Sequence, residues 1–307
     1  MAGINTRPQW PILLDPTFRS IYNMTEKEIP SEIANIFEVE STSKAYVKDT
    51  SVTGLGKMLQ KAEGDTIVYT SPISGYPVIY TPKTFALGEA ITYELYSDDE
   101  TGIIKKAPAR LAKARAHTRE QFAADLLNFG FTYGGGGETL FNGGDGKALF
   151  AIDHPRKDGG AVQSNYTTAA LSEDALEAGM LAMRRTVDQR GEKVAVRATH
   201  LIVPPELEKE ARILLDSQLR TGTANNDINP YKGRLQIVVW DYLASTTAWF
   251  LVDATQNPLK WINRDYRGLE GPEYDFDTKS AKWSVVDRFT VGFSDWRGIY
   301  GSKGDNS

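Results

Sequence analysis

The longest regular spacing of apolar positions lies between residues 108 and 129. There an apolar or small side chain returns every three or four residues, which places the set on one face of an α-helix. The set is Leu111, Ala114, Thr118, Phe122, Leu126 and Phe129. Gly130 follows directly and is a common helix end. The pattern therefore predicts one helix over 108–129, roughly 30 Å long at 1.5 Å per residue.

Two shorter helices are predicted farther along the chain. Ser172 is a suitable N-terminal cap because Glu173 and Asp174 follow it in the first turn, and the apolar stripe behind them runs toward Gly191. The other helix is predicted over 206–219, directly after two prolines that end a strand.

Alternating or short continuous apolar runs predict strands between and after these helices. The predicted strands cover 36–47, 66–70, 76–81, 90–96, 148–152, 199–203, 235–240, 249–252 and 283–293. The region from 36 to 96 is rich in strands but poor in apolar residues, and a small sheet of that kind is marginal alone in water. We expect this region to need a partner surface, and we expect an α+β protein.

The first 24 residues look like an extended arm. Pro8, Pro11 and Pro16 oppose regular structure, while Trp10, Leu13, Leu14 and Phe18 are apolar and should lie against a surface. That surface belongs either to the same domain or to a neighbouring subunit, and the sequence leaves both alternatives open.

Composition and charge narrow the functional classes. The 307 residues include no cysteine, which excludes disulfides, cysteine-ligated zinc and thiol nucleophiles and fits a reducing cytoplasm. No run of 18 apolar residues occurs and prolines interrupt the start of the chain, so neither a membrane span nor a signal peptide is expected. The formal net charge of -5 counts against a dedicated nucleic-acid reader.

Two glycine-containing segments resemble ligand loops superficially. Residues 54–57 read Gly-Leu-Gly-Lys, but the glycine spacing is not that of a phosphate loop, and Met58 stands where serine or threonine is needed. Residues 134–137 are four glycines without a preceding strand. We interpret the first as a flexible tip and the second as a flexible connector.

Candidate catalytic or metal-binding groups are sparse. The three histidines, His117, His154 and His200, lie on different predicted elements, and Asp153-His154 is interpreted as a structural turn before a proline. The carboxylates Glu270, Glu273, Asp275 and Asp277 lack the regular ligand spacing of a calcium loop and are interpreted as a solvated acidic loop. The sequence indicates no cofactor and no metal.

Several motifs in a definite order give the chain a resemblance to a known family. They are "LFAIDHP" at 149–155 with Ser164-Asn165 and Leu171-Ser172 after it, "HLIVPPELEKEARILL" at 200–215, and "FSDWRGIYGS" at 293–302. Together with the order of elements, these resemble the HK97-like capsid fold, and more closely the major head subunits of Mu-like tailed phages. The resemblance covers nearly the whole chain.

The resemblance implies a division into named domains. An N-terminal arm would occupy 1–30, and an extended β-rich E-loop, which lies over a neighbouring subunit, would occupy 44–90. The peripheral (P) domain would comprise 31–43, 91–165 and 251–307 with a spine helix at 106–129. The axial (A) domain, which meets its copies at the centre of a capsomer, would comprise 166–250.

The implied function is that of a major capsid protein, a structural subunit and not an enzyme. Copies would form hexamers and pentamers of an icosahedral shell in the virion, assembled in the bacterial cytoplasm around double-stranded DNA. Implied partners are a separate scaffolding protein, a portal protein and decoration proteins, with weak non-specific contact to DNA and no membrane.

One branch of the fold joins an E-loop lysine to an asparagine of another subunit. Lys57, Lys61 and Asn263 lie in suitable regions but are interpreted as ordinary surface groups.

Two groups of residues are expected to carry contacts. The expected intersubunit residues are Trp10, Leu13, Leu14 and Phe18 in the arm and Leu55, Met58, Leu59, Ile67, Tyr69, Tyr76 and Ile79 in the E-loop. The basic residues Lys106, Arg110, Lys113 and Arg119 of the long helix are expected to face a neighbour or DNA. The alternatives are a soluble hydrolase with an unrecognised site and a nucleic-acid-binding module. Self-association into many copies distinguishes the capsid hypothesis from both, because neither alternative requires it.

Overall fold

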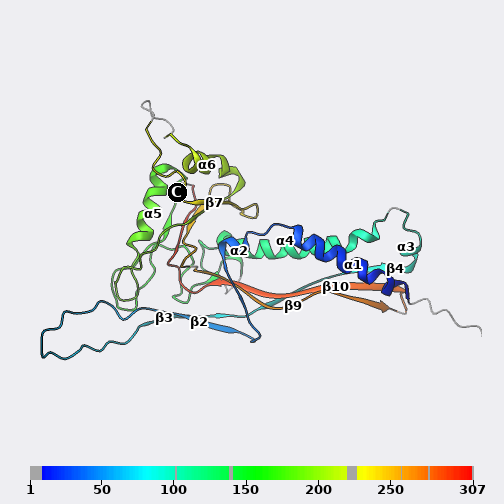
Figure 1. Cartoon of the computed structure of the whole chain (residues 1–307), viewed down its shortest axis with the longest axis horizontal. Coiled ribbons are helices and arrows are strands. Elements are labelled where there is room, and N and C mark those ends of the chain that lie inside the picture. Colours follow the sequence, from blue (N-terminus) through cyan, green and yellow to red (C-terminus); the bar gives the residue numbers. More distant parts are fainter. Residues whose placement is uncertain are drawn as a thin grey trace, which may run out of the picture.

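The computed structural model of the chain describes residues 9–100, 102–137, 141–219, 227–256, 258–275 and 277–305. A long, flat lower layer carries an upper unit that rises from one of its ends (Figure 1). A hairpin of β2 (Val47–Val52) and β3 (Ser74–Tyr80) projects from that same end. The turn between β9 and β10 lies at the opposite end, close to α3 (Tyr93–Ser97).

The lower layer is built on a four-stranded sheet in the order β1-β9-β10-β4. The strands are β1 (Glu38–Ser41), β9 (Leu259–Asp275), β10 (Ser280–Phe293) and β4 (Lys83–Thr92). β10 pairs antiparallel with both β9 and β4, whereas β1 pairs parallel with β9. Bulky side chains of this sheet, Trp261, Trp283 and Phe289 among them, are buried, and they give the layer its core.

Helix α4 (Ala107–Asn128) lies along the sheet and confirms the predicted spine helix, with ends within one residue of those expected. It buries Leu111, Ala123, Leu126 and Leu127. The apolar stripe identifies this helix correctly because its spacing of three and four residues continues over six turns, which no β-strand pattern would match.

From residue 9 on the predicted extended arm is wrong, because α1 (Gln9–Glu28) is a helix that packs beside α4 (Figure 1). Residues 1–8 of the predicted arm lie outside the described residues. Pro11 falls in the first turn, where the backbone N–H groups have no helical partner in any case, and only Pro16 removes an interior hydrogen bond. The spacing of Leu14, Phe18 and Tyr22 forms a helical stripe that packs against the lower sheet. The free energy gained by burying that stripe is larger than the cost of the one hydrogen bond that Pro16 removes.

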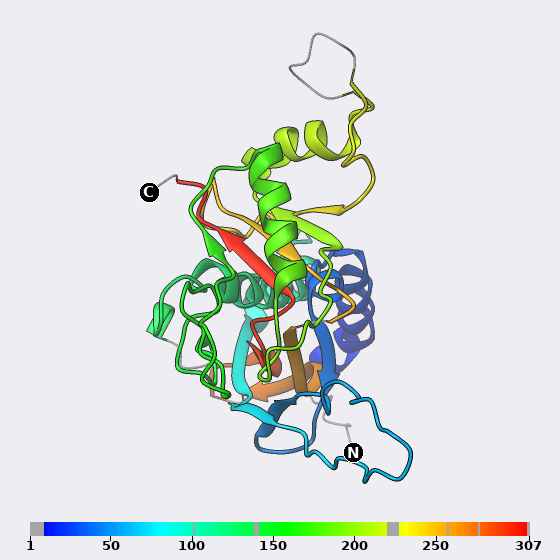
Figure 2. The same cartoon turned by 90° about the vertical axis from the view of Figure 1, so that its left-hand side faces the viewer.

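The upper unit has a five-stranded sheet in the order β5-β11-β8-β6-β7. The strands are β5 (Tyr166–Thr167), β11 (Ile299–Ser302), β8 (Trp249–Val252), β6 (His200–Val203) and β7 (Gln236–Val239). Helices α5 (Glu173–Arg185) and α6 (Glu208–Asp216) supply apolar side chains to one core cluster with this sheet. Figure 2 shows α5 (green) standing upright in the upper unit, with α6 (yellow-green) beside its upper end. The predicted strands 199–203, 235–240 and 249–252 and the cap at Ser172, which accepts from Ala175 N, are confirmed.

Several predicted strands need correction. The region 36–47 contains the short helix α2 (Ile33–Ile36) at its start and β1 in its middle, and 66–70 has no strand. The predicted strand 90–96 ends at Thr92, because the Thr92 hydroxyl accepts from Leu95 N and caps α3. Residues 148–152 are irregular: Leu149 and Phe150 are buried, but Ala151 N bonds to a side chain instead of a strand.

The predicted acidic loop is wrong for three of its four carboxylates, since Glu270, Glu273 and Asp275 lie on the long strand β9 and only Asp277 lies in the turn after it. Asp275 pairs with Lys282 across the hairpin at 2.7 Å, and that hydrogen bond lowers the pKa of Asp275 to about 2. Gly268, Gly271 and a proline mask the strand in the sequence, because such residues usually mark loops. Short 3-10 turns complete the fold at Ile104–Lys106, Gly135–Gly137 and Pro205–Leu207.

Candidate functional site

The hairpin tip, residues 53–73, is the most exposed apolar segment that the structure describes. Between β2 and β3 it has no regular structure, and its side chains find no core of their own. Met58 is 99% exposed and Tyr69 is 90% exposed. Leu55, Leu59, Ile67 and Val68 are each more than half exposed. Such a cluster is unfavourable in water and indicates a surface that another molecule covers.

The base of the hairpin, in contrast, is anchored firmly to the lower layer. Tyr80 is fully buried and bonds through its hydroxyl to Ser294 at 2.7 Å. Lys260 Nζ lies 2.9 Å from Asp49 and 2.9 Å from Glu40. Burial opposes ionisation of Asp49, but hydrogen bonds from Ser294 and Lys260 outweigh it and lower the pKa of this carboxyl.

Two further contacts hold the tip toward the upper unit. Lys57 Nζ lies 3.3 Å from a carboxylate oxygen of Glu192, and the guanidinium of Arg190 donates to the carbonyl of Ser71. Lys57 is thus engaged in its own subunit and lies in an irregular tip with no helix behind it, which is not the geometry of a phosphate loop.

The remaining predicted E-loop residues are divided between surface and framework. Ile79 is 56% exposed, whereas Tyr76 is half-buried beneath Lys157, whose ammonium lies 4.8 Å from the ring centroid. Ile79 therefore joins the exposed apolar surface, and Tyr76 holds the hairpin to its own subunit.

The predicted arm contacts lie mostly inside the subunit. Phe18 is 1% exposed and its ring lies 4.8 Å from that of Trp283, and Leu14 is half-buried in the same cluster. Of the two alternatives for the arm, packing on its own domain is therefore what the structure has for these two residues. The side chains of Trp10 and Leu13 lie outside the described residues.

The basic residues of α4 divide in the same way. Arg110 pairs with Glu89 of β4, and Arg119 Nη1 lies 2.9 Å from the buried Asp287. Arg119 is therefore held inside the subunit, whereas Arg110 remains half-exposed beside its partner. Lys106 and Lys113 are exposed.

Asn263, the conceivable partner of an E-loop lysine, has its amide oxygen engaged. It accepts from Arg119 Nη2 and from Trp261 Nε1, each at 2.9 Å. Asn263 is thus a structural residue of the lower layer and not the ordinary surface group expected from the sequence.

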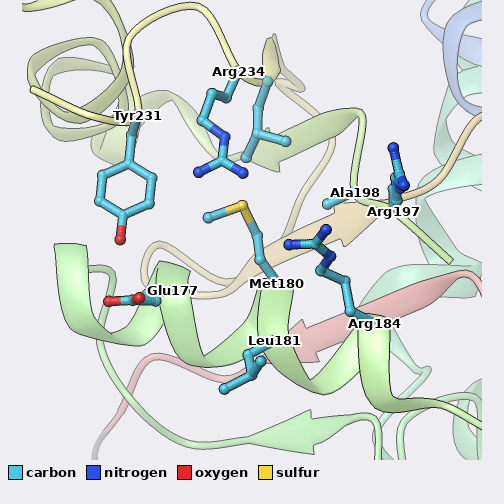
Figure 3. A pocket seen from close by; sticks show the side chains of 9 residues that line it. Glu177, Met180, Leu181, Arg184, Arg197, Ala198, Tyr231 and Arg234 are labelled. Atoms are coloured by element: carbon cyan, nitrogen blue, oxygen red, sulfur yellow. The ribbon is translucent and has the colours of Figure 1, made fainter. Parts of the chain in front are cut away.

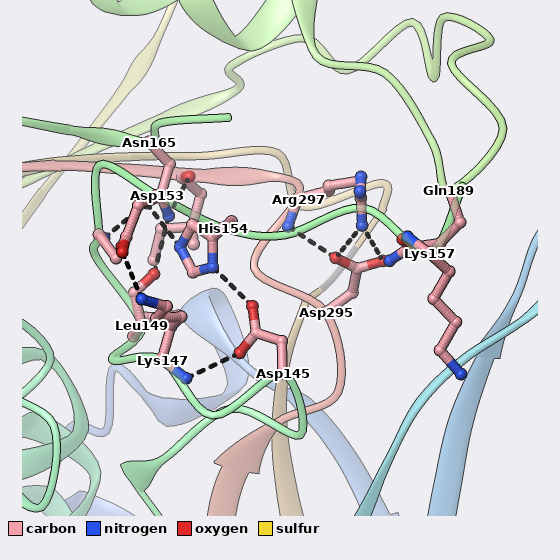
Figure 4. A network of polar contacts seen from close by, with 12 residues as sticks. Asp145, Lys147, Leu149, Asp153, His154, Lys157, Asn165, Gln189, Asp295 and Arg297 are labelled. Carbon is pink, nitrogen blue, oxygen red and sulfur yellow. Dashed lines mark hydrogen bonds and ion pairs between the residues drawn. The ribbon is translucent and has the colours of Figure 1, made fainter. Parts of the chain in front are cut away.

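His154 belongs to a buried polar network and not to an open pocket (Figure 4). The ring is 0% exposed; Nδ1 lies 2.7 Å from Asp145, and Nε2 lies 3.2 Å from the amide oxygen of Asn165. Trp296 stacks on the ring at 4.3 Å between centroids. Since both nitrogens are engaged and no substrate has access, the structural interpretation of His154 is supported.

The same network explains the irregular segment around Leu149. The amide nitrogen of Asn165 donates to Leu149 O at 2.8 Å and to Ile299 O at 3.3 Å, while its oxygen accepts from Ala151 N at 3.1 Å. One side chain thus replaces the strand pairing that residues 148–152 lack. The motif pair "LFAIDHP" and Ser164-Asn165 marks this junction in the sequence, but its hydrogen-bonding role could not be read from it.

No catalytic or metal-binding centre emerges from the part of the chain that the structure describes. His117 and His200 contact Tyr242 and Thr199 and lie on α4 and β6, away from His154. Among the described residues, no group of three or more histidine, aspartate or glutamate side chains could hold a metal ion. None of the described helices combines the length and the apolar character that crossing a membrane requires.

An apolar groove of about 400 Å³ lies between α4 and strands β4 and β10. Phe85, Leu87, Leu111, Val285 and Phe289 line it. Leu87 is 53% exposed at this groove. The groove and the hairpin tip are therefore two apolar surfaces at different places on the same subunit.

Comparison with known proteins gives a consistent picture. The sequence model of a family described as "Phage capsid protein" matches residues 75–302. The major capsid protein of Escherichia phage Mu is 40% identical over 73 residues, which span 24% of this chain and 24% of the Mu protein.

Solved structures with low sequence identity share the fold. The capsid of an empty GTA particle has a TM-score of 0.57 at 14% identity, covering 89% of this chain and 90% of that chain. The capsid of bacteriophage JBD30, decorated with minor capsid protein trimers, has a TM-score of 0.54 at 16% identity, covering 70% of this chain and 92% of that chain.

Proposed function

The chain belongs to the phage capsid protein family and has an HK97-like fold, and on this premise we propose that it is the major capsid protein of a tailed bacteriophage. Many copies associate into hexamers and pentamers, and these close into an icosahedral shell around double-stranded DNA. The role is assembly and not catalysis. The observation that carries the proposal is the hairpin tip, whose apolar side chains are exposed although its base is anchored.

We assign the domain names according to the sheet to which each strand belongs. The β2–β3 hairpin is the E-loop, the four-stranded sheet with α4 is the P domain, and the five-stranded sheet with α5 and α6 is the A domain. We place β4 in the P domain because it pairs with β10, and β11 in the A domain because it pairs with β8. Both assignments move the boundaries expected from the sequence.

The tip is long enough to reach another subunit. From Val52 to the turn at Glu63 and Gly64 the chain runs for roughly 35 Å at 3.3 Å per residue if extended. We propose that the tip of one copy covers the apolar groove beside α4 of the next copy. Tip and groove are different surfaces, so the contact is heterologous, and such a contact forms a ring when the rotation from one copy to the next closes on itself.

The energy of this contact comes mainly from removing the tip from water. Fully burying one side chain such as methionine or leucine contributes about 1.5–3 kcal/mol. The exposed apolar residues of the tip together supply on the order of 10 kcal/mol, from which the ordering of the tip and the loss of rigid-body freedom subtract. A contact of modest net strength suits a lattice that must correct errors while it closes.

Further partners follow from the same function. We propose scaffolding and portal proteins during assembly in the host cytoplasm, and decoration proteins on the finished virion. The exposed Lys106 and Lys113 supply weak, salt-sensitive contact either to DNA or to a neighbouring copy.

Velocity sedimentation and negative-stain electron microscopy of the purified chain, with and without a scaffolding partner, test the proposal. The parent protein should form rings of five or six, shells or tubes. Met58→Asp and Tyr69→Asp should remain folded and largely unassembled, because both side chains are solvated in the free subunit. Thr66→Asp, an exposed polar residue of the same tip, adds equal charge without removing apolar surface and should assemble normally.

Two results would count against the proposal. A parent protein that stays a compact monomer at every concentration, even with scaffold, excludes a shell subunit. Tip variants that assemble as well as the parent exclude the hairpin as the principal contact.

A further inference from the structure

A pocket of about 280 Å³ on the upper unit combines positive charge with an apolar floor (Figure 3). Its lining residues are Glu177, Met180, Leu181, Arg184, Arg197, Ala198, Tyr231, Arg234 and Leu235. Arg184 of α5 and Arg234, which precedes β7, approach from opposite sides of Met180, and Arg197 stands at the rim beside Ala198. We call this the arginine pocket.

The three guanidinium groups lack acidic partners among the described residues. Arg184, Arg197 and Arg234 are exposed, and no carboxylate of the described chain lies within ion-pair distance of them. The one carboxylate in the lining, Glu177, is engaged by the hydroxyl of Tyr231. Three like charges around one pocket repel one another, so an anionic occupant would stabilise them.

The floor of the pocket limits the kind of anion. Met180 is half-buried, Leu181 is 43% exposed and Leu235 is buried. The phosphate backbone of a nucleic acid would pair with the arginines but would leave this apolar surface exposed to water. A helix that presents carboxylates together with an aliphatic side chain would use both.

Such a helix face exists on the same chain. Glu206, Glu210 and Ile213 follow one another at intervals of four and three residues, which places them on one side of the helical segment that ends in α6. All three are exposed, Ile213 by 38%, whereas Ala211 and Leu215 are buried on the side facing the sheet.

We call Glu206, Glu210 and Ile213 the acidic stripe. Its two glutamates have no basic partner among the described residues. The neighbouring Glu208 and Asp216 behave differently, because both pair with Arg212, at 2.8 Å and 3.6 Å. Glu206 and Glu210 are therefore available to a partner without breaking an ion pair inside the subunit.

We propose that the arginine pocket of one copy receives the acidic stripe of the adjacent copy within a capsomer. This inference rests on the proposed function and deepens it by assigning a contact between A domains. Pocket and stripe are different surfaces of one unit, so the contact is heterologous and repeats around a ring. Carboxylates meet the arginines, and Ile213 covers the apolar floor.

Charge reversal tests the assignment. Arg234→Glu and Glu210→Arg should each raise the protein concentration needed for half-maximal assembly by about tenfold or more, because like charges then face each other. The double variant Arg234→Glu with Glu210→Arg should restore assembly toward that of the parent. Arg185→Glu, one residue beyond Arg184 and outside the pocket, is the matched control and should assemble normally.

Circular dichroism and thermal unfolding of each variant establish that the subunit is folded, and the milder Arg234→Gln replaces any variant that is not. Single reversals that assemble like the parent overturn the inference while the proposed function stands. Loss of assembly without rescue in the double variant shows that the pocket takes another acidic partner and overturns the assignment to α6. Normal assembly with impaired retention of DNA assigns the pocket to nucleic acid and overturns it too. A parent chain that forms no rings or shells overturns the proposed function itself.

Discussion

Replacement of Asp287 by alanine should destabilise the subunit strongly. Its side chain is 4% exposed and lies 2.7 Å from Arg115 Nε and 2.9 Å from Arg119 Nη1. The two arginines are 14% and 17% exposed, so both charges would lose their buried counterion. Leaving a buried charge without its partner costs about 3–5 kcal/mol.

Remaining contacts of the arginines place the expected loss at the lower end of that range. Arg115 keeps Glu26 and lies 3.6 Å over the Tyr266 ring, and Arg119 keeps Asn263. We therefore expect Asp287→Ala to lower the free energy of unfolding by about 3 kcal/mol, or roughly a hundredfold in the folded-to-unfolded ratio.

Equilibrium urea unfolding followed by tryptophan fluorescence is the appropriate assay. A Met58→Asp background keeps the subunit from assembling, so that the midpoint reports the subunit alone. Asp265→Ala is the control, because its pair with Arg267 is 3.4 Å long and solvent-exposed and should be worth less than about 1 kcal/mol. If the free energy of unfolding of Asp287→Ala lies within about 1 kcal/mol of that of its parent, the reasoning is refuted.

Three further predictions concern other parts of the subunit. Asn165→Ala should lower the unfolding free energy by about 3 kcal/mol or more, measured by urea unfolding, since it leaves several buried backbone groups unpaired. The pKa of Asp49 lies below its ordinary value of 3.8, so its pair with Lys260 stabilises the hairpin base above about pH 4 and is lost as pH falls through the lowered pKa. The protection factor of the β2 amides, which is the ratio of their intrinsic to their observed exchange rate at each pH, should therefore be high at pH 7 and fall as the pH drops below 3.8, before that of β8. Ser172→Ala should cost about 1 kcal/mol and raise exchange in the first turn of α5, whereas exchange in α6 should not change.

Much of the fold could be predicted from the sequence where one signal dominates. The long helix α4 and the buried strands β6 and β8 carry an apolar period with no competing breaker. Helix α1 and strand β9 could not be predicted, because each contains prolines or glycines whose local cost is outweighed by burial against the lower sheet. Tertiary packing decides these elements, and no local pattern reports it.

The candidate surfaces show the same limit. The apolar tip was predictable because Leu55, Met58 and Tyr69 stand in a segment too polar to form a core. The arginine pocket was not, since Arg184, Arg197 and Arg234 are far apart in sequence and meet only after α5 and β7 pack on the upper sheet. The fate of Phe18 was open for a related reason: an apolar residue after a proline gives no sign of which subunit buries it.

The distribution of exposed apolar groups separates the stability of the subunit from that of the shell. Met58, Tyr69 and Ile228 are 99%, 90% and 82% exposed, and they lie on the hairpin tip and on the outer part of the upper unit, away from the buried clusters. Replacing them removes little that holds the free subunit together. Replacing Asp287 removes nothing from these outer surfaces. Because distant sites without shared partners add independently, the cost of Asp287→Ala to folding should be the same with and without Met58→Asp, while only the latter changes the strength of assembly in a folded subunit.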